Sequence, residues 1–430
     1  PTHPEREERL LYTRDQLKEE GIFDIEGITE YRPEFCSYAD IERVHFCLPS
    51  IQAVTTDSHL ASAGGAITAA RLVLENREQK AFALVRPPGH HSMRVVHGNR
   101  GFCNINNEAV MIAWIRDHYE HPDGRPLRIV DTDVHHADGS QDIFWNDPDT
   151  LFISFHQDGR TLYPGTGFLS ENGGPAALGR TVNIPLPPGT SDEGYLYVLK
   201  NIVFPILDDF KPDFVINSAG QDNHFTDPLA NEQLSAQGYA ALNAALSPDV
   251  AVLEGGYSIR GALPYVNLGI CLALAGLPAD DIREPDWTPA STRQAPEIGE
   301  YIRRLGAKVL YQYMNPPSHP TEGEEKDGFW TRRKSIFYDT DYIQEHQTES
   351  WGICPDCHGL GVIETQSSKV PLSYCVLIPR GVCPRCREKA AGLLDRAKRS
   401  GRYAHILCID EDSTRNTPKK PWPLKEKKWR

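Results

Sequence analysis

Short apolar runs alternate with longer helical patterns over the first 275 residues of the chain. Five runs look like buried strands, and each ends in polar or glycine-rich residues: "AFALVRPPGHH" (81–91), "LRIVDTDVHH" (127–136), "LFISFH" (151–156), "FVINSAGQD" (214–222) and "VAVLEGGYS" (250–258). Helical patterns lie between them, over 63–78, 106–120, 194–210 and 232–246. This alternation predicts an α/β fold with a mostly parallel sheet flanked by helices. Ligands of such sheets bind beyond the carboxyl ends of the strands, where the polar residues gather.

The strand over 127–136 ends in a dense group of carboxylates and imidazoles. Asp133 and His135 are two residues apart and therefore share a face of the extended chain, with Asp131 one pleat behind. A carboxylate beside an imidazole is a suitable ligand pair for a divalent metal. Asp222, at the end of a separate strand, is a candidate third ligand. Taken alone, each of these residues is more typical of a capped or salt-bridged strand end.

The motif "RPPGHH" places two adjacent histidines after another strand. Pro87 and Pro88 end the strand, and Gly89 permits a sharp turn into His90 and His91. An adjacent histidine pair suits metal binding or proton transfer more than packing. Each ring needs a carboxylate to fix its tautomer and tune its basicity, and Asp131 and Asp138 are candidates for that task.

Seven motifs follow one another in an order that is typical of one known family. They are "RPPGHH", "GFCNINNEAV", "DTDVHHADG", "SFH", "YPGTG", "AGQDNHFTDPL" and "EGGYS", and "HPEREERL" precedes them. In order and approximate spacing, the chain over roughly 3–275 resembles the histone deacetylase family, within the arginase/deacetylase fold. The resemblance implies a metal-dependent deacetylase that hydrolyses linear amide bonds.

The resemblance also implies roles for individual residues. The catalytic zinc ligands would be Asp133, His135 and Asp222, an aspartate-rich set that is also compatible with Fe²⁺. The proton-handling tandem would be His90 paired with Asp131 and His91 paired with Asp138, with His91 as general base and acid. Tyr257 would polarise the substrate carbonyl and stabilise the oxyanion. The residues that match a structural potassium site in the family are Asp131, Asp133, His135 and Ser154.

The substrate tunnel of the family corresponds to Gly101, Phe102 and Tyr163, with Leu229 at the rim. Many relatives carry Phe where this chain has Tyr163, which predicts a slightly more polar tunnel. Members that prefer acetylpolyamines tend to carry an acidic residue at the position of Leu229. The apolar residue therefore favours an acylated lysine in a protein or peptide over a small acylated amine, and acetylpolyamine hydrolysis is the alternative.

A second alternative is a catalytically silent scaffold that binds partners through the C-terminal part of the chain. The presence of every expected ligand, both histidines and Tyr257 argues against it.

Six of the ten cysteines lie between Cys354 and Cys408. Two CxxC pairs separated by 25 residues predict a structural zinc site in a zinc-ribbon-like module; the ligands are Cys354, Cys357, Cys383 and Cys386. A redox-active dithiol pair or metal-free cysteines are the alternatives. Cys375 and Cys408 could replace one of the four ligands or stay free. We predict a catalytic domain over 1–318, a linker over 319–345, the zinc module over 346–410 and a basic tail over 411–430.

The net charge of −14 argues against a broad basic surface for nucleic acid. No apolar run reaches the roughly 18 residues of a membrane span, and the scattered cysteines of the first 300 residues are typical of reduced thiols. We therefore predict a cytoplasmic protein without membrane contact. The basic tail is predicted to be a disordered solubilising segment, with a contact to phosphate or an acidic partner as the alternative, and the C-terminal module could contact nucleic acid or protein.

Overall fold

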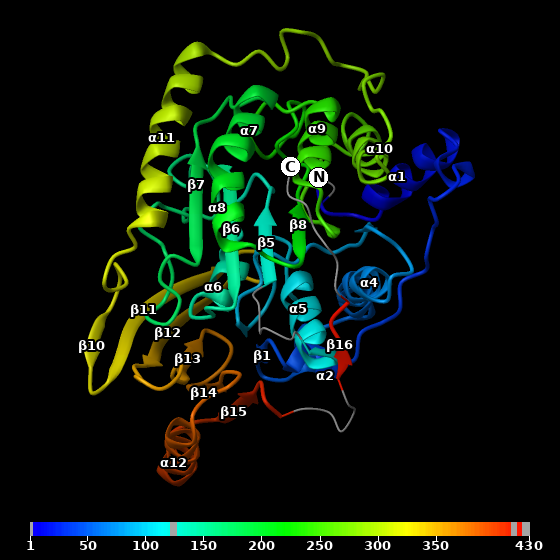
Figure 1. The fold of residues 1–430 in the computed structure, drawn as a ribbon. Coiled ribbons are helices and arrows are strands. Elements are labelled where there is room, and N and C mark those ends of the chain that lie inside the picture. The colour runs from blue at the N-terminus through cyan, green and yellow to red at the C-terminus, as the bar shows by residue number, and fades with distance from the viewer. Residues whose placement is uncertain (1–2, 121–126, 414–418, 424–430) are drawn as a thin grey trace.

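The computed structural model describes residues 3–120, 127–413 and 419–423 (Figure 1). Its centre is a six-stranded parallel sheet with the order β2-β9-β8-β5-β6-β7. The strands are β2 (Ala81–Ala83), β5 (Leu127–Asp131), β6 (Thr150–Gln157), β7 (Thr181–Leu186), β8 (Val215–Ala219) and β9 (Val250–Leu253). The predicted α/β fold is confirmed, and five of the six strands coincide with predicted runs, although β6 extends one residue beyond its run at each end. The sequence prediction missed β7, an edge strand whose Pro185 is tolerated at the edge of the sheet.

Helices cover both faces of this sheet, as Figure 1 shows. Alternate residues of the strands point into two separate apolar layers: Ile129 and Ile216 into one, Val130 and Val215 into the other. The first layer contains α4 (Asp57–Leu74), α5 (Asn107–His118) and α6 (Asp138–Phe144). The second contains α1 (Glu8–Glu19), α7 (Asp192–Val198), α8 (Phe204–Phe210), α9 (Ala236–Leu246), α10 (Leu263–Leu274) and α11 (Pro296–Met314).

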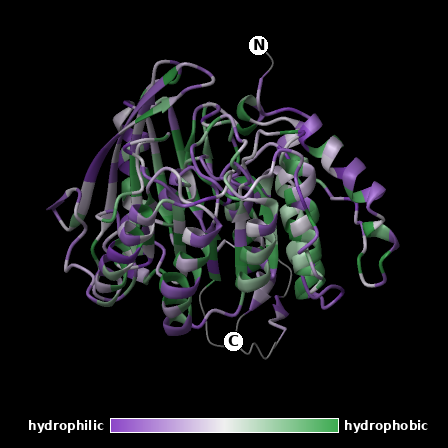
Figure 2. Cartoon of the chain, turned by 90° about the horizontal axis from the view of Figure 1, so that it is seen from above, coloured by the Kyte–Doolittle hydropathy of each residue, from purple (hydrophilic) through white to green (hydrophobic). Residues whose placement is uncertain are grey.

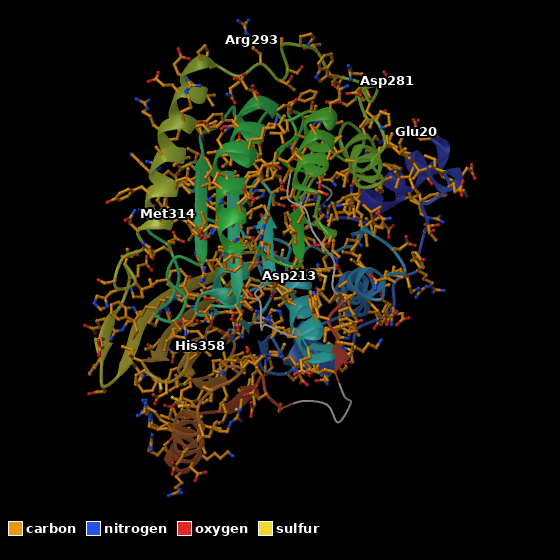
Figure 3. All side chains as sticks on the ribbon, viewed as in Figure 1. Glu20, Asp213, Asp281, Arg293, Met314 and His358 are labelled. Atoms are coloured by element: carbon orange, nitrogen blue, oxygen red, sulfur yellow. The ribbon has the colours of Figure 1, made fainter. Side chains whose placement is uncertain are left out.

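Shorter elements complete this part of the chain. They are the 3-10 turn Ile22–Asp24, α2 (Tyr38–Glu42), β1 (Phe46–Cys47), α3 (Ile51–Val54), β3 (Val95–Val96), β4 (Tyr119–Glu120) and the π-helical turn Leu199–Val203. In Figure 2 hydrophobic residues concentrate between the sheet and the helices, and hydrophilic residues lie on the outer sides. Charged side chains such as Glu20, Asp281 and Arg293 extend outward (Figure 3). None of the helices in the described part of the chain is long and apolar enough to cross a membrane.

Local sequence explains where the helices next to the site begin. Asn106 precedes α5, and its side chain accepts a hydrogen bond from the backbone N–H of Ala109. At the start of α9 the side chain of Ser235 likewise accepts a hydrogen bond from the backbone N–H of Gly238. Each contact satisfies one of the free N–H groups of a helix start.

A second six-stranded sheet forms from the C-terminal part of the chain, with the order β10-β11-β12-β13-β14-β15. Its elements are β10 (Glu324–Lys326), β11 (Phe329–Tyr338), β12 (Ile343–Gly352), β13 (Gly361–Ser367), β14 (Ser373–Ile378), α12 (Pro384–Ser400) and β15 (His405–Asp410). All neighbouring strands are antiparallel except β14 and β15, which are parallel. We refer to β10–β15 with α12 as the C-terminal sheet.

The predicted linker over 319–345 contains β10, β11 and the first residues of β12. The polar residues of β11 concealed the strand in the sequence, because one of its faces is exposed. Arg333 and Ser335 point outward, whereas Ile336 and Tyr338 are buried. The four cysteines lie in the connection between β12 and β13 and at the start of α12, where they pack against a sheet that already begins at β10 and not near residue 346.

The C-terminal sheet packs directly on the rest of the molecule. Trp351 and Leu377 from the sheet share one apolar cluster with Phe46, Val95 and Trp145. A buried ionic group also joins the two parts, because Lys334 and Arg332 of β11 contact Asp142 of α6 and Glu349 of β12. The sheet is thus held by both apolar and charged contacts.

Part of the basic tail is ordered against the first part of the chain. β16 (Lys420–Pro421) pairs with β4, and the Lys420 ammonium lies 2.7 Å from Glu75. The Trp422 ring lies 6.1 Å from that of Phe214. The prediction of a disordered tail is therefore wrong for residues 419–423, because an aromatic ring is packed there. Residues 414–418 and 424–430 lie outside the described part of the chain.

Candidate active site

The candidate site lies beyond the carboxyl ends of β5, β8 and β9, together with the loop that follows β2. β5 leads into Asp133 and His135, β8 into Asp222, and β9 into Tyr257. Glycines allow these segments to approach closely. A Cβ atom at Gly220 would lie 2.0 Å from Asp133 Oδ2, so only glycine fits there.

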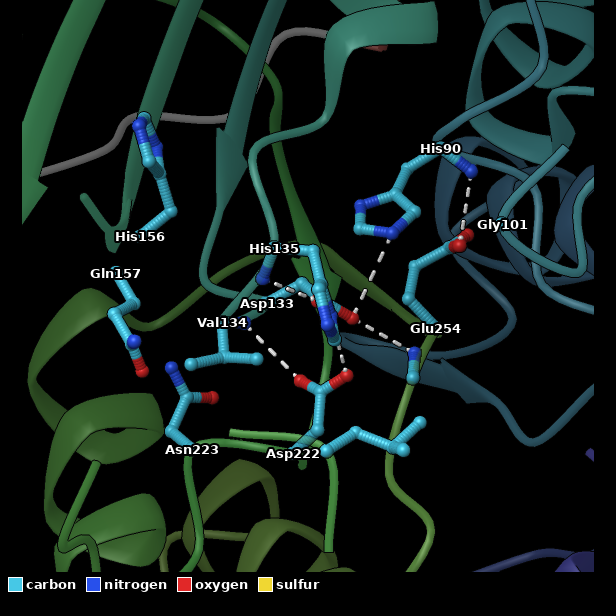
Figure 4. A network of polar contacts seen from close by, with 12 residues as sticks. His90, Gly101, Asp133, Val134, His135, His156, Gln157, Asp222, Asn223 and Glu254 are labelled. Carbon is cyan, nitrogen blue, oxygen red and sulfur yellow. Dashed lines mark hydrogen bonds and ion pairs between the residues drawn. The ribbon is translucent and has the colours of Figure 1, made fainter. Parts of the chain in front are cut away.

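The three predicted metal ligands point toward one another, as Figure 4 shows. His135 Nδ1 lies 3.0 Å from Asp222 Oδ2 and 3.2 Å from Asp133 Oδ1. All three residues are buried, and one potential ligand atom from each lies within 4.8 Å of the others. Backbone N–H groups orient the carboxylates: Gly255 donates to Asp133 Oδ2 at 2.8 Å, and Val134 donates to Asp222 Oδ1 at 3.1 Å.

This arrangement fits a divalent metal. Two carboxylates and one imidazole are hard and borderline ligands of the kind that bind Zn²⁺ or Fe²⁺. Asp133 and Asp222 would otherwise be two buried negative charges side by side, which is costly without a cation. Asp133, His135 and Asp222 could therefore hold the metal.

The two histidines of "RPPGHH" each contact the carboxylate expected from the sequence. His90 Nδ1 lies 3.2 Å from Asp131 Oδ2, and His91 Nδ1 lies 2.8 Å from Asp138 Oδ1. The two rings are 4.1 Å apart, and all four residues are buried. Each contact leaves the Nε2 atom of its histidine as the second titratable nitrogen.

The two histidines have opposite pKa shifts. Burial alone would lower the pKa of His90, but the carboxylates of Asp133 and Asp131 outweigh it and raise that pKa well above its usual value. Burial, together with the positive charges of His90 and Arg100, lowers the pKa of His91 well below its usual value. A cation held by Asp133 would offset the charge of that carboxylate, so Asp133 would raise the pKa of His90 less. The same cation would lower the pKa of His91 further. His91 is therefore the neutral member that can accept a proton.

The predicted tunnel residues contact either His91 or Tyr257. The Tyr257 ring packs edge-on against Phe102 at 5.4 Å, and the Tyr163 ring lies 5.1 Å from His91. Burial raises the pKa of the Tyr257 hydroxyl well above its ordinary value, which keeps it protonated. The backbone of Gly101 lies against the His91 ring, since a Cβ atom at Gly101 would be 2.4 Å from His91 Cδ2.

Leu229 and Ser154 lie close to the site but outside its centre. The N–H of Leu229 donates to Asp227, whose other carboxylate oxygen accepts from the N–H of Tyr257 at 2.7 Å. Ser154 lies opposite Asp131 in the sheet register, and its hydroxyl contacts His156 at 2.8 Å. The predicted potassium role of Ser154 stays a prediction.

His136 has no place among the ligands. Its ring contacts Thr166 at 2.8 Å and Gln141 at 3.1 Å, and burial lowers its pKa to about 4. It is a neutral packing and hydrogen-bonding residue next to the site.

Sequence reasoning missed several residues that shape this site. Arg100 Nη1 lies 2.5 Å from Asp138 Oδ2, and the Arg9 guanidinium lies over the Tyr257 ring at 5.2 Å. Asp339 of the C-terminal sheet contacts the backbone N–H of Gly101. Arg9 lies within the motif "HPEREERL", but that motif does not show that Tyr257 is its partner, and no quoted motif contains Arg100 or Asp339.

The four cysteines of the CxxC pairs form a separate cluster. Cys354, Cys357, Cys383 and Cys386 place their sulfur atoms within 4.8 Å of one another. A backbone hydrogen bond from Asp356 and a contact from Arg385 lower the pKa of Cys354 to about 6. Cys375 is buried in β14 and Cys408 is exposed in β15, so neither joins the cluster.

Comparisons with known proteins agree with this arrangement. The family model of the histone deacetylase domain matches residues 49–267. The chain belongs to the histone deacetylase family. Members of this family are hydrolases that act on amide bonds, and the match ends before the C-terminal sheet begins.

Two relatives and one solved structure illustrate the family membership. A probable deacetylase of Archaeoglobus fulgidus is 46% identical over 314 residues, which cover 66% of this chain and 85% of that protein. Histone deacetylase 14, chloroplastic, of Arabidopsis thaliana is 41% identical over 189 residues, with 42% and 43% covered. The crystal structure of the HDA15 HD domain matches with a TM-score of 0.62 and 27% identity, covering 73% of this chain and 90% of that one.

Proposed function

We propose that this chain is a zinc-dependent amidohydrolase that removes acetyl or related acyl groups from lysine side chains. The observation that carries the proposal is the convergence of three groups at one edge of the sheet. These groups are the buried Asp133, His135 and Asp222 set, the His91–Asp138 pair, and Tyr257. Membership of the histone deacetylase family supports the same reaction class.

The residues of the chain supply the proton transfers. A zinc ion held by Asp133, His135 and Asp222 would supply Lewis-acid polarisation of the amide carbonyl and would acidify water. Asp138 accepts the Nδ1 hydrogen of His91, so His91 Nε2 is free to take a proton from the attacking water. The same nitrogen then protonates the leaving amine.

Tyr257 stabilises the charge that develops on the substrate oxygen. Its hydroxyl stays protonated because burial raises its pKa, so it donates a hydrogen bond to the oxyanion. The backbone N–H of Tyr257 is held by Asp227, which fixes the segment that presents the hydroxyl. Such a preorganised donor lowers the barrier by about 3–4 kcal/mol in other enzymes.

The tunnel residues and Leu229 support an acyl-lysine substrate. Gly101, Phe102 and Tyr163 lie around His91 and Tyr257, where an extended alkyl chain would pass. Leu229 adds no charge near the Tyr257 segment. Acetylpolyamine hydrolysis is the second candidate, because the carboxylate of Asp339 lies beside Gly101 and could attract a distant ammonium.

A panel assay tests both candidates. Metal-loaded protein is offered acyl-lysine peptides with acyl chains of several lengths and, separately, acetylpolyamines, beside the variants His91→Ala and Tyr257→Phe. We expect turnover of acyl-lysine that both substitutions strongly reduce. The absence of turnover on every amide, or turnover that neither substitution changes, would refute the proposal, and a preference for polyamines would favour the second candidate.

We also propose a structural zinc ion bound by Cys354, Cys357, Cys383 and Cys386. Four cysteine sulfurs within 4.8 Å of one another match a closed tetrahedral site. The pKa of Cys354 is lowered, which favours the thiolate, whereas burial raises the pKa of Cys386, so zinc binding would have to displace the proton of that thiol. A potassium ion near Asp131 and Ser154 stays a prediction. So do a cytoplasmic location and a contact of the C-terminal sheet with nucleic acid or protein.

A further inference from the structure

The turn between β11 and β12 contacts the wall of the candidate active site. Both oxygens of Asp339 lie near the backbone N–H of Gly101, at 3.0 and 3.3 Å. Asp341 Oδ2 accepts the backbone N–H of Asn99 at 2.6 Å. Two carboxylates of the C-terminal sheet thus hold a loop that precedes them by more than 230 residues.

The loop that they hold touches the residue assigned as general base. A Cβ atom at Gly101 would lie 2.4 Å from His91 Cδ2 and 3.0 Å from Tyr163 Cε1, so the backbone there lies directly against both rings. The preceding residue, Arg100, forms the 2.5 Å ion pair with Asp138, the partner of His91. The loop therefore contacts the His91 ring directly through Gly101 and indirectly through the ion pair of Arg100 with Asp138.

The turn itself is firmly anchored. Glu345 of β12 is fully buried and accepts hydrogen bonds from Tyr338 at 2.7 Å, Gln347 at 2.6 Å and Thr365 at 2.5 Å. His97, four residues before Gly101, lies 3.3 Å from the same carboxylate. The Tyr338 hydroxyl also reaches the backbone carbonyl of Val95 at 2.9 Å. Because these groups are buried and mutually bonded, the turn has little freedom to move away from the loop.

We propose that Asp339 and Asp341 are positioning residues for the deacetylase reaction and that the C-terminal sheet is part of the catalytic unit. The inference rests on the proposed function, and it goes beyond the family match, which ends at residue 267. Asp339 fixes Gly101 and, through Arg100 and Asp138, the orientation of His91. Asp341 fixes the beginning of the same segment.

The substitutions Asp339→Ala and Asp339→Asn separate this role from a structural one. A displacement of about 1 Å at a reacting group can lower the rate by about 100-fold, so we expect Asp339→Ala to lower kcat by about 10- to 100-fold with a smaller change in KM. Asn keeps an oxygen that accepts the Gly101 N–H. Asp339→Asn should therefore retain kcat within about threefold.

The assay uses the metal-loaded chain of 430 residues and a short acyl-lysine substrate, so that contacts outside the tunnel contribute little. Asp395→Ala is the matched control, because Asp395 is an exposed residue of α12 whose carboxylate pairs with Arg399 one turn along the same helix. Thermal unfolding and hydrogen exchange of the 97–101 segment accompany the kinetics. We expect faster exchange of this segment in Asp339→Ala and no change in the control.

Several results would overturn the inference. One is Asp339→Ala with kcat within twofold of the unmodified chain. Another is an equal loss for Ala and Asn that follows a lower unfolding temperature. A third is a KM that rises only for acetylpolyamines, in Asp339→Ala and Asp339→Asn alike. That result would show that the negative charge of Asp339 binds the substrate. An unmodified chain that hydrolyses no amide would instead refute the proposed function, so the two failures can be told apart.

Discussion

Gly255 offers a direct test of the candidate metal site, because its Cα lies against both carboxylates. A Cβ added there would be 2.1 Å from Asp222 Oδ2 and 2.7 Å from Asp133 Oδ2. Carbon makes favourable non-bonded contacts at about 3.5–4.0 Å, so the Asp222 carboxylate would have to retreat by about 1 Å or more. Gly255 does not have a positive φ, and the substitution Gly255→Ala therefore acts through this clash and not through backbone strain.

A shift of this size exceeds what a metal site tolerates, since ligand distances vary by only about 0.2 Å. Loss of the groups that orient ligands typically weakens metal binding by about 10- to 100-fold, and a displaced ligand should cost at least as much. We therefore expect Gly255→Ala to bind zinc at least about 10-fold more weakly, which corresponds to about 1.4 kcal/mol.

Chelator competition measures the affinity, and deacetylation at limiting zinc reports its consequence. The control Gly299→Ala, on the outer helix α11, places its Cβ 3.4 Å from the nearest atom and should leave both measurements unchanged. Undiminished zinc affinity and normal activity in Gly255→Ala would show that Asp133 and Asp222 do not bind the metal together. That result would refute our interpretation of the site.

Four further outcomes are expected. His91→Ala should lower the rate constant of the chemical step by about 100- to 10,000-fold, and Tyr257→Phe should lower it by about 100- to 1,000-fold. Single-turnover assays measure this rate constant, and the unfolding curves should be unchanged. Full activity of either variant would remove that residue from the mechanism. His91 acts as a base in its neutral form, and its pKa is lowered below 6.5. We therefore expect kcat/KM to be retained above that pKa and to be lost as the pH falls through a value below 6.5. A loss of kcat/KM that already sets in above pH 6.5 would contradict the assignment of His91 as the base. Cys354→Ser with Cys357→Ser should reduce bound zinc from about two ions per chain to about one by elemental analysis, and an unchanged ratio would disprove the cluster. Trp351→Ala removes a buried ring between the C-terminal sheet and the rest of the chain and should cost about 3–5 kcal/mol in denaturant unfolding, whereas a loss below 1 kcal/mol would indicate a loose interface.

The C-terminal sheet changes how the chain divides into parts. Its apolar cluster includes Trp145 and Phe46 of the first part, and its charged residues contact Asp142 on the helix that begins at Asp138. A module on a flexible linker would make few such contacts. The sheet is therefore bound to the structure that carries the candidate active site.

The sequence alone determined five of the six strands of the central sheet and the central residues of the site. Alternating strand and helix patterns specify a parallel sheet, and the carboxyl ends of its strands meet at one edge. Asp133, His135, Asp222 and Tyr257 therefore had to lie together once their strands were recognised. The CxxC spacing likewise predicted the four-cysteine cluster, because each pair brings two thiols onto one turn of the chain.

Only the tertiary structure decided what surrounds that site. The contact of Asp339 with Gly101 spans 238 residues, and no local pattern encodes it. β11 resembled a linker because a half-exposed strand carries as many polar residues as a loop, and its buried face became visible only when it packed on Met93. Local periodicity specifies which residues can face a core, but the partner of each face is chosen by packing of the whole chain.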